Sequence, residues 1–438
     1  MSTWPPWGVV AMSRRITVEE LTRVEGHGGL EVVVEGGVVK EARFNVHEGP
    51  RFFEHAVKTM GYEKVPDVTR RICAICTASH SLASIGAIEA AFGVEVSDQT
   101  KALRRLLMLG EIIESHALHV FLLALPDYLG YPDAIQMASA HGEAVKGALQ
   151  LKKAGNLIHN VLSGREVHGM NERVGGFSRL PSPQQLEEVG RLLEAVAPVA
   201  ELGVELLSGF EPPGYNDSEN VLMALEPYYG YGYLGEVVQV SDGMRFHQSQ
   251  YLDHIEEGVY PHTYAKFSLY GGQSFMVGSL PRLVLNHGGL KGRALSLYRE
   301  NRHLVSPGNS MCNNLAQALE LVQCVEDARR LVEGFLSDGL EEEGLAEVEP
   351  ASGRGVNAVE APRGVLYHDY VFDEEGVLAK ANIVTPTAQN GANIEKDAMV
   401  VAGNLAGAPE GELVKALEMM ARAYDPCISC SVHLVRVE

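Results

Sequence analysis

Two Cys-x-x-Cys pairs lie at opposite ends of this 438-residue chain. The first is Cys73-Ala74-Ile75-Cys76, and the second is Cys427-Ile428-Ser429-Cys430, which stands close to the C-terminus. Two intervening residues allow both sulfurs of a pair to face one point, so the two pairs together can form a four-thiolate site for a soft or borderline metal. If the pairs meet, the fold must bring both ends of the chain together around one buried metal site.

Spacing alone leaves both a catalytic metal site and a structural zinc site open. Pairs that bind structural zinc mostly lie ~15–20 residues apart in a small module, whereas about 350 residues separate these two pairs. A disulfide scaffold is disfavoured because the chain has only six cysteines and no recognisable secretory signal precedes them. A thioredoxin-like redox motif needs one pair in a small βαβ domain, not two pairs.

Composition excludes several other classes of protein. The net charge of −21 gives a surface that repels nucleic acid and anionic lipid, so neither is an expected partner. No run of 18 apolar residues is present, so no transmembrane helix or membrane insertion is expected. The first residues lack the basic and apolar regions of a signal peptide. We therefore expect residues 1–15 to form a loose tail and the protein to be cytoplasmic.

Hydrophobic periodicity predicts a mainly α chain with small β regions (α+β), in which a long-helix bundle is flanked by small β-sheets. Residues 29–46 alternate around Gly36-Gly37 as in a β-hairpin, and a second β patch is expected over 355–385. A helix should begin at Ser97-Asp98 and end at Pro126. One metal site built from both ends further predicts that residues 1–438 form a single intertwined domain. Other helices are expected at 137–163, 183–209, 314–338 and 411–424.

The residues around both cysteine pairs resemble the signatures of the nickel–iron hydrogenase large subunit. The stretch from Arg71 to His80 resembles its amino-terminal signature, and the stretch from Asp425 to His433 resembles its carboxy-terminal one. The quinone-site subunit of respiratory complex I shares the fold but lacks these cysteines, so the resemblance is to the hydrogenases. Three further stretches match the family in the same order: Arg23-Val24-Glu25-Gly26-His27, Glu360-Ala361-Pro362-Arg363-Gly364 and Pro386-Thr387.

This resemblance implies a bimetallic site held by the four cysteines. Nickel would take all four sulfurs, with Cys73 and Cys427 as terminal ligands and Cys76 and Cys430 bridging to an iron that carries carbonyl and cyanide ligands. The implied reaction is heterolytic cleavage of H2. Cys427 would be the nearest base and Glu25 the next proton acceptor, since a proton needs a titratable relay to leave a dry site.

Other side chains would serve the iron and its ligands. The Arg363 guanidinium could donate hydrogen bonds to the diatomic ligands and pair with Asp425. The Thr387 hydroxyl would donate to a cyanide, and His80 would hydrogen-bond a bridging sulfur. Ser115 departs from the respiratory uptake members of the family, which often carry an acid at this position. That departure fits the soluble cytoplasmic branch, which is NAD(P)-linked or sulfhydrogenase-like.

The resemblance also implies a magnesium site near the second cysteine pair. Its ligands would be Glu54, the backbone carbonyl of Ile383, and His433. Hard cations prefer oxygen ligands, so the identity of this metal rests on the resemblance. Residues 434–438 resemble the extension that a maturation protease removes after nickel chaperones have loaded the site.

The chain offers no route of its own for the electrons. No Gly-x-Gly-x-x-Gly or Walker motif follows a predicted strand. The two remaining cysteines, Cys312 and Cys324, are too few for an iron–sulfur cluster and are expected to be buried. Electrons must therefore pass to an iron–sulfur small subunit, and from there to an NAD(P)- or flavin-dependent diaphorase. The expected reaction is H2 = 2 H+ + 2 e−, and the alternatives are an H2-sensing regulatory subunit and a structural zinc-binding protein.

Overall fold

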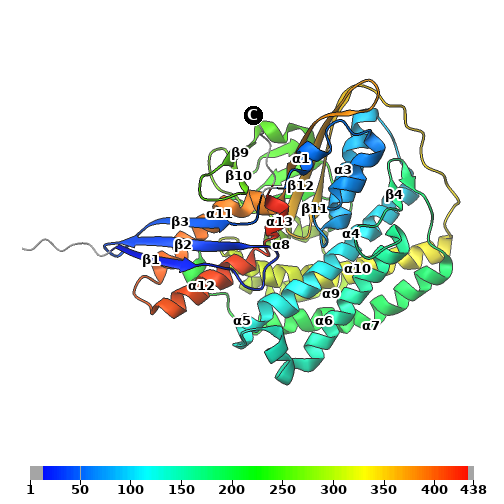
Figure 1. Ribbon diagram of the computed structural model, residues 1–438. Coiled ribbons are helices and arrows are strands. Elements are labelled where there is room, and N and C mark those ends of the chain that lie inside the picture. The colour runs from blue at the N-terminus through cyan, green and yellow to red at the C-terminus, as the bar shows by residue number, and fades with distance from the viewer. Residues whose placement is uncertain (1–12, 50, 433–438) are drawn as a thin grey trace, which may run out of the picture.

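Four long helices pack side by side in the computed structural model, which describes residues 13–49 and 51–432 (Figure 1). Helix α4 packs against α6 and α10, and α7 packs against the same two helices. Side-chain caps fix three of the helix starts: Ser97 accepts from the N–H of Thr100, as the predicted start at Ser97-Asp98 requires, Asp133 from that of Gln136, and Ser182 from that of Gln185. The predicted bundle is confirmed. Its helices are α4 (Asp98–Leu118), α6 (Ala134–Ser163), α7 (Pro183–Ser208) and α10 (Asn313–Asp338).

The helix that begins at Asp98 does not end at Pro126, contrary to the prediction. It passes through a π-helical segment (His119–Ala124) into α5 (Leu125–Leu129), and Pro126 lies in the first turn of α5. A proline is tolerated there because the π-helical segment before it interrupts the i→i−4 hydrogen-bond ladder, which a residue without an N–H cannot join. The stretch Asp98–Leu129 is long and apolar enough to cross a membrane by length and composition, but 83% of its most apolar window is buried inside the fold.

The N-terminal sheet projects from the body of the molecule, with α11 (Pro386–Asn404) and α12 (Glu410–Ala423) beside it (Figure 1). It consists of β1 (Ser13–Val18), β2 (Gly28–Glu35) and β3 (Val38–Val46), paired antiparallel in that order. Gly36 and Gly37 both have positive φ, 60° and 79°, as the tight turn of this hairpin requires. Residues 13–15, predicted to belong to a loose tail, pair with β2 instead. Residues 1–12 of that tail lie outside the described residues.

A second three-stranded sheet packs against α3 (Thr77–Phe92) and confirms the predicted β patch. Its strands are β11 (Gly353–Ala361), β12 (Gly364–Phe372) and β13 (Leu378–Val384). Asp373 closes the turn between the last two by accepting from the N–H groups of Glu375 and Val377.

Several further elements complete the fold, and among them α12 confirms the helix that was expected at 411–424. The strands are β4 (Glu172–Arg173), β5 (Gly176–Phe177), β6 (Met223–Glu226), β7 (Val237–Val240), β8 (Arg245–His247), β9 (Ile255–Val259) and β10 (Lys266–Tyr270). The helices are α1 (Phe53–Ala56), α2 (Val65–Thr69), α8 (Ser279–Asn286), α9 (Gly292–Asn301), α11 (Pro386–Asn404), α12 (Glu410–Ala423) and α13 (Ile428–Ser431).

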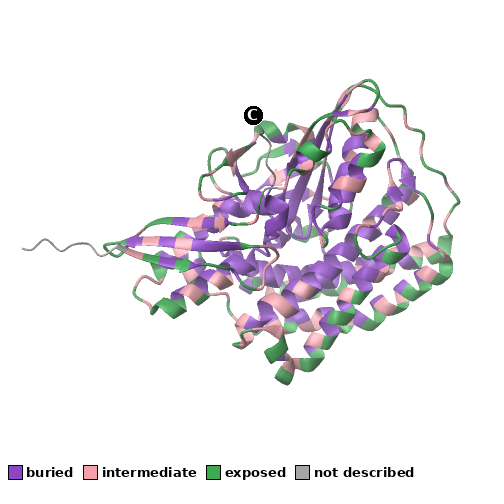
Figure 2. Ribbon diagram, viewed as in Figure 1, coloured by how far each residue is buried: buried purple, intermediate pink, exposed green. Residues whose placement is uncertain are grey.

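Segments from the N-terminal and C-terminal parts of the described chain meet in the interior. Figure 2 shows continuous burial where the bundle, the β11–β13 sheet and α13 come together. All four clustered cysteines belong to the largest apolar core cluster. A parallel β-bridge joins Glu25 to Cys427, and the N–H of Ile428 donates to the carbonyl of Glu25 at 2.9 Å. The predicted convergence of both ends on one buried site is therefore confirmed.

Candidate metal centre

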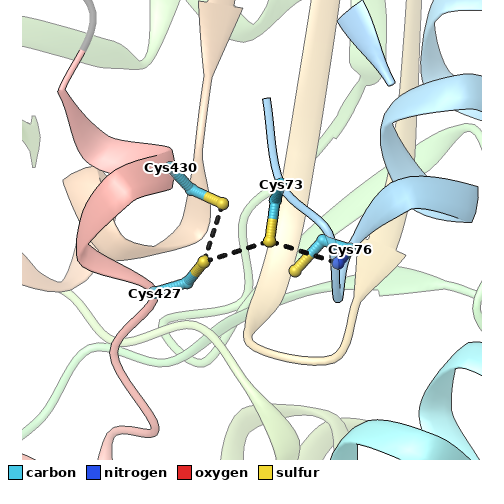
Figure 3. A group of neighbouring side chains, drawn as sticks. All are labelled: Cys73, Cys76, Cys427 and Cys430. Carbon is cyan, nitrogen blue, oxygen red and sulfur yellow. Dashed lines mark hydrogen bonds between the residues drawn. The ribbon is translucent and has the colours of Figure 1, made fainter. Parts of the chain in front are cut away.

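The two Cys-x-x-Cys pairs face one another in the core (Figure 3). Their four sulfur atoms all lie within 4.8 Å of one another, and no cysteine of the four is more than 4% exposed. The Cys73 and Cys427 sulfurs are 3.4 Å apart, and those of Cys427 and Cys430 are 2.8 Å apart. All six cysteines of the chain are free, so the disulfide alternative is not realised.

Local structure explains why each pair converges. Cys76 is the residue that precedes the first turn of α3, and its N–H donates to the Cys73 sulfur at 3.3 Å. Cys427 holds the same position before α13, and the N–H of Cys430 donates to its carbonyl at 3.2 Å. The N-terminus of α3 carries the positive end of the helix dipole, which stabilises a thiolate.

Neighbouring sulfurs and burial shift the pKa values of the four thiols. The pKa of Cys73 lies well below its ordinary value because the sulfurs of Cys427, Cys430 and Cys76 hydrogen-bond to it. Burial raises the pKa of Cys427 and Cys430 well above theirs. The pocket therefore opposes a full set of four negative charges in the absence of a cation. Binding of a divalent metal would release protons and supply the missing charge.

The cysteines are not equivalent in their surroundings. A small enclosed cavity of about 10 Å³ adjoins Cys76, Cys427 and Cys430, whereas Cys73 does not line it. This is about the room that one water-sized species occupies. A four-thiolate set with free space on one side suits nickel together with a second metal better than a closed tetrahedral zinc site. The other lining residues are His80, Ala361, Arg363, Leu366, Pro386 and Thr387.

Arg363 forms the cationic wall of this cavity. Its Nη1 donates to the Cys76 sulfur at 3.4 Å, its Nε to the carbonyl of Asp425 at 2.8 Å, and its Nη2 to the Asp425 carboxylate at 3.0 Å. Burial alone would lower the pKa of this guanidinium, but Asp425 and the neighbouring thiols raise it well above its ordinary value. The predicted pairing of Arg363 with Asp425 is present, and Arg363 is a permanent positive charge beside the sulfurs.

Thr387 on α11 and His80 on α3 line the same cavity. The Thr387 hydroxyl oxygen accepts from the N–H of Cys427 at 2.9 Å, which leaves its proton free to donate. His80 lies one turn into α3, and its Nδ1 is 3.1 Å from Nε2 of His368 on β12. Burial lowers the pKa of His80 to about 4, so this imidazole is neutral near pH 7.

Glu25 reaches the site from the N-terminal segment. The Cys427 thiol donates to its Oε2 at 3.1 Å, and the hydroxyl of Ser429 donates to its Oε1 at 2.5 Å. The next residue must be glycine: Gly26 has φ +85°, and an added Cβ would lie 2.8 Å from the side chain of Ile428. The Arg-Val-Glu-Gly-His motif thus packs directly on the second cysteine pair.

Glu111 is a site residue that the sequence did not reveal. It lies on α4 one turn before Ser115, whose buried hydroxyl has no hydrogen-bond partner. The Glu111 carboxylate accepts from the N–H of Ala78 at 2.6 Å and from that of Ser79 at 3.1 Å. It therefore caps the N-terminus of α3, directly after Cys76. Burial outweighs these hydrogen bonds and raises the pKa of Glu111 to about 8.

This raised pKa predicts a specific pH dependence of stability. The ordinary value is 4.5, so between pH 4.5 and about 8 the folded state holds a proton that the unfolded state has lost. The stability from Glu111 is complete below pH 4.5 and is lost as pH rises through 8. Glu111→Gln should remove this loss, so the variant should gain a few kcal/mol relative to the parent over that range. Calorimetric melting of both proteins at several pH values checks it, and a pH-independent difference would contradict it.

A second unpredicted feature is a buried ionic network behind Arg363. Arg282 on α8 is fully buried and donates to Glu320 on α10 at 2.7 Å and to Glu360 on β11 at 2.8 Å. The same guanidinium donates to the carbonyls of Ala361 and Pro362 at 3.0 and 2.9 Å. These two residues directly precede Arg363. Arg282 therefore holds the turn that presents Arg363 to the sulfurs.

The residues of the expected magnesium site are only partly described. Glu54 is 2% exposed; its Oε1 accepts from the N–H of Ile383 at 2.8 Å and lies 3.4 Å from Nζ of Lys266. Its Oε2 is buried and has no hydrogen-bond partner, so this oxygen could bind a cation. Burial raises the pKa of Glu54, as expected for a carboxyl that lacks a full set of partners. The contact to Ile383 runs through its N–H, and His433 lies outside the described residues.

The chain matches two family models. The model described as nickel-dependent hydrogenase covers residues 51–150 and 244–433. A HoxL-like model covers residues 15–48. Together these ranges include both cysteine pairs and the segment that carries Glu25.

Relatives match over nearly the whole length. The chain is 43% identical to sulfhydrogenase 2 subunit alpha and 39% to sulfhydrogenase 1 subunit alpha, both of Pyrococcus furiosus, and 96% of the chain and at least 98% of each relative are covered. It is 29% identical to the NAD-reducing hydrogenase HoxS subunit beta of Cupriavidus necator, with 96% and 95% covered.

Solved structures agree with the sequence matches. An NAD+-reducing [NiFe]-hydrogenase in the H2-reduced state superposes with a TM-score of 0.86 at 25% identity, with 97% of this chain and all of that one covered. A [NiFeSe]-hydrogenase of Dm. baculatum shares the fold at a TM-score of 0.78 and 21% identity, with 96% and 100% covered. The four-cysteine centre binds nickel and iron, and the chain belongs to the nickel-dependent hydrogenase family, as the large subunit that catalyses the oxidation or production of H2, in the branch of the sulfhydrogenase alpha subunits.

Proposed function

We propose that Cys427 and Glu25 carry the proton formed from H2 out of this site. The observation that supports the proposal is the 3.1 Å contact between the Cys427 thiol and Glu25 Oε2. When bound, the nickel–iron pair supplies the Lewis acid and the electron acceptor for heterolytic cleavage. The Cys427 sulfur is then the protein base nearest the reaction, and Glu25 takes the proton from it over one hydrogen bond.

The cavity wall suits an iron with diatomic ligands. Cys73 and Cys427 would bind nickel alone, and Cys76 and Cys430 would also hold the iron. Of the two terminal ligands, Cys73 does not line the cavity, whereas Cys427 lines it beside Glu25. Carbonyl and cyanide ligands would lie where the Arg363 guanidinium and the Thr387 hydroxyl can donate hydrogen bonds to them. Asp425 orients Arg363, and His80 lines the same cavity with a neutral ring.

Electrons would leave through other polypeptides. Among the described residues, the four-cysteine cluster is the one group able to hold a metal through three or more Cys, His or acidic side chains. An iron–sulfur small subunit would therefore accept the electrons. A diaphorase that binds flavin and NAD(P) is proposed as the next partner, because one relative is named as part of an NAD-reducing hydrogenase. Free cysteines throughout the chain favour a reducing, cytoplasmic location.

Two further proposals concern the C-terminal region. Magnesium would be bound by the unpartnered Oε2 of Glu54, by the carbonyl of Ile383 and by His433.

We also propose that residues 434–438 are removed by a maturation protease after nickel chaperones load the site. The nickel-dependent hydrogenase model matches up to residue 433, which agrees with a mature end at His433.

Metal analysis with infrared spectroscopy tests the site as a whole. Purified active protein should contain nickel and iron at about one each and show infrared bands of bound carbonyl and cyanide. Zinc as the sole metal, with no such bands, would contradict the proposal. An assay of H2 turnover with the co-purified partner subunits separates an enzyme from an H2 sensor, which would hold the same metals but turn over very slowly.

Glu25→Gln tests the proton path. Glutamine keeps the size of the side chain but cannot take a proton from Cys427, so proton-coupled turnover should fall by ~10²- to 10⁴-fold, the usual contribution of general acid–base catalysis. Nickel and iron contents should not change, because the Glu25 side chain is not one of the metal ligands. Isotope exchange between D2 and solvent protons at the full parental rate would show that another residue receives the proton.

A further inference from the structure

We infer that Asp127 is a positioning residue that sets the contact between Glu25 and Cys427. The inference rests on the proton path proposed above. Glu25 and Cys427 are 402 positions apart, and their segments are joined by one parallel β-bridge and by hydrogen bonds from the Ser429 N–H and hydroxyl to the Glu25 carboxylate. These contacts are confined to the few residues around Glu25 and Cys427, so they do not fix the course of the two segments that carry them. The 3.1 Å distance between the thiol and the carboxylate therefore needs additional anchors on both segments.

The first anchor is Arg23, two residues before Glu25. Arg23 has φ 60°, in the left-handed region that costs a non-glycine residue about 1–3 kcal/mol. Side-chain contacts hold it in this conformation: Nη1 donates to the carbonyl of Leu123 at 2.6 Å, and Nη2 forms an ion pair with one carboxylate oxygen of Asp127. The conformation that aims Glu25 at the sulfur thus depends on Asp127.

The second anchor is Arg422, five residues before Cys427. It lies in the last turn of α12 and is 1% exposed. Its Nη1 pairs with the other carboxylate oxygen of Asp127, while Nε and Nη2 donate to the carbonyl of Thr22 at 3.1 and 3.0 Å. Arg422 therefore bonds to the Glu25 segment directly as well as through Asp127.

Asp127 is the anion shared by these two cations. It lies in the first turn of α5, and its side chain is 8% exposed. Without this charge, two largely buried guanidiniums would face each other across a neutral group, and their repulsion would separate the Thr22–Glu25 segment from α12. A displacement of about 1 Å at a reacting pair can lower a rate by ~10²-fold. Asp127 thereby acts on proton transfer without contact with either partner.

A double-variant experiment tests this inference. Asp127→Asn should lower kcat by ~10- to 100-fold with unchanged KM for H2 and unchanged nickel and iron contents. If Asp127 acts through Glu25, the combined Glu25→Gln and Asp127→Asn variant should be no slower than Glu25→Gln alone. Multiplied effects in the double variant would overturn the role of Asp127. If Glu25→Gln alone had no effect, the proposed proton path would fail, which is a distinguishable outcome.

Hydrogen exchange gives a readout that does not depend on turnover. Amides of residues 21–27 should exchange faster in Asp127→Asn than in the parent protein. Glu89→Gln is the matched control, because Glu89 binds Arg104 at 2.6 and 2.7 Å in another buried ion pair on α3 and α4. That control should leave the 21–27 amides and kcat unchanged. If Asp127→Asn does not fold, Asp127→Glu keeps the charge but shifts it by one methylene, and it should show a smaller loss of kcat with the same lack of additivity.

Discussion

Serine in place of Cys73, Cys76, Cys427 or Cys430 should leave the purified protein without its nickel–iron pair. A hydroxyl is a hard, weakly acidic donor and cannot replace a soft thiolate. The four sulfurs lie within 4.8 Å of one another, so each one contributes to the same small site. H2 turnover should fall below detection for each variant. Elemental analysis should show nickel at less than about a tenth of the parental content, and the carbonyl and cyanide bands should be absent.

The two remaining cysteines supply the control for this experiment. Cys312 and Cys324 are also buried and free, but the Cys324 sulfur hydrogen-bonds Tyr233, and the Cys312 sulfur donates to the carbonyl of Leu304. Cys312→Ser and Cys324→Ser should therefore keep full metal content, with at most a modest loss of stability. Retention of nickel by any of the four ligand variants at the level of these controls would contradict the assignment of that cysteine as a ligand.

Most of the elements that were predicted have an amphipathic pattern. The hairpin around Gly36-Gly37 and helices α6 and α7 each bury one face, so their periodicity is visible in the sequence. Helices α4 and α10 are enclosed along much of their length and were predicted from their apolar content and from the end signals at Ser97-Asp98 and Gly339. Helix α3 was not predicted because it is buried on almost every side from Thr77 to Glu89, which leaves no polar face. Helix α11 is enclosed in the same way and carries buried Gln and Asn side chains. The end of α4 was misplaced because the π-helical segment before Pro126 depends on tertiary packing.

The candidate site was predictable where a short motif carries the chemistry. The meeting of the cysteines and the pairing of Arg363 with Asp425 followed from motif resemblance. Glu111, Arg282 and Glu320 were not found, because they act on backbone groups that come from other parts of the chain. One signal existed for Glu320: it stands between Leu319 and Leu321 and is the one charged residue from Asn313 to Val325. A lone acid in such a place is buried with a partner or not buried at all.

Arg282→Met should be the most destabilising single change outside the cysteines. Removal of one partner from a buried ion pair costs about 3–5 kcal/mol because it leaves an uncompensated charge. Arg282 pairs with two buried carboxylates, Glu320 and Glu360, and donates to the carbonyls of Ala361 and Pro362 as well. Thermal unfolding should show a melting temperature many degrees lower, and nickel loading should fall because the turn before Arg363 loses its support.

Arg293→Met is the matched control, because its ion pair has the same Nε–carboxylate distance as that of Arg282 but is exposed to solvent and not buried. Arg293 Nε donates to Glu201 at 2.7 Å, the same distance as from Arg282 Nε to Glu320, but the Arg293 and Glu201 side chains are 45% and 40% exposed. An exposed pair is worth about 0–1 kcal/mol, so this variant should melt close to the parent protein. Equal effects of the two substitutions would show that the buried network does not hold the Arg363 turn.

The pH dependence of the Arg282→Met defect gives a second check. In the parent protein Arg282 holds the pKa of Glu320 well below its ordinary value, although burial alone would raise it. The contribution of Glu320 to parental stability is therefore present above its unfolded pKa and is lost only at much lower pH. Without Arg282, burial raises the pKa of Glu320, so the folded variant takes up a proton and becomes relatively more stable as pH falls from 7 toward about 4.5. The difference in unfolding free energy between parent and variant should therefore narrow over that range. A difference that does not change with pH would contradict this account. It would mean that the variant is destabilised by the lost packing of the arginine side chain and not by the carboxylates left without a partner.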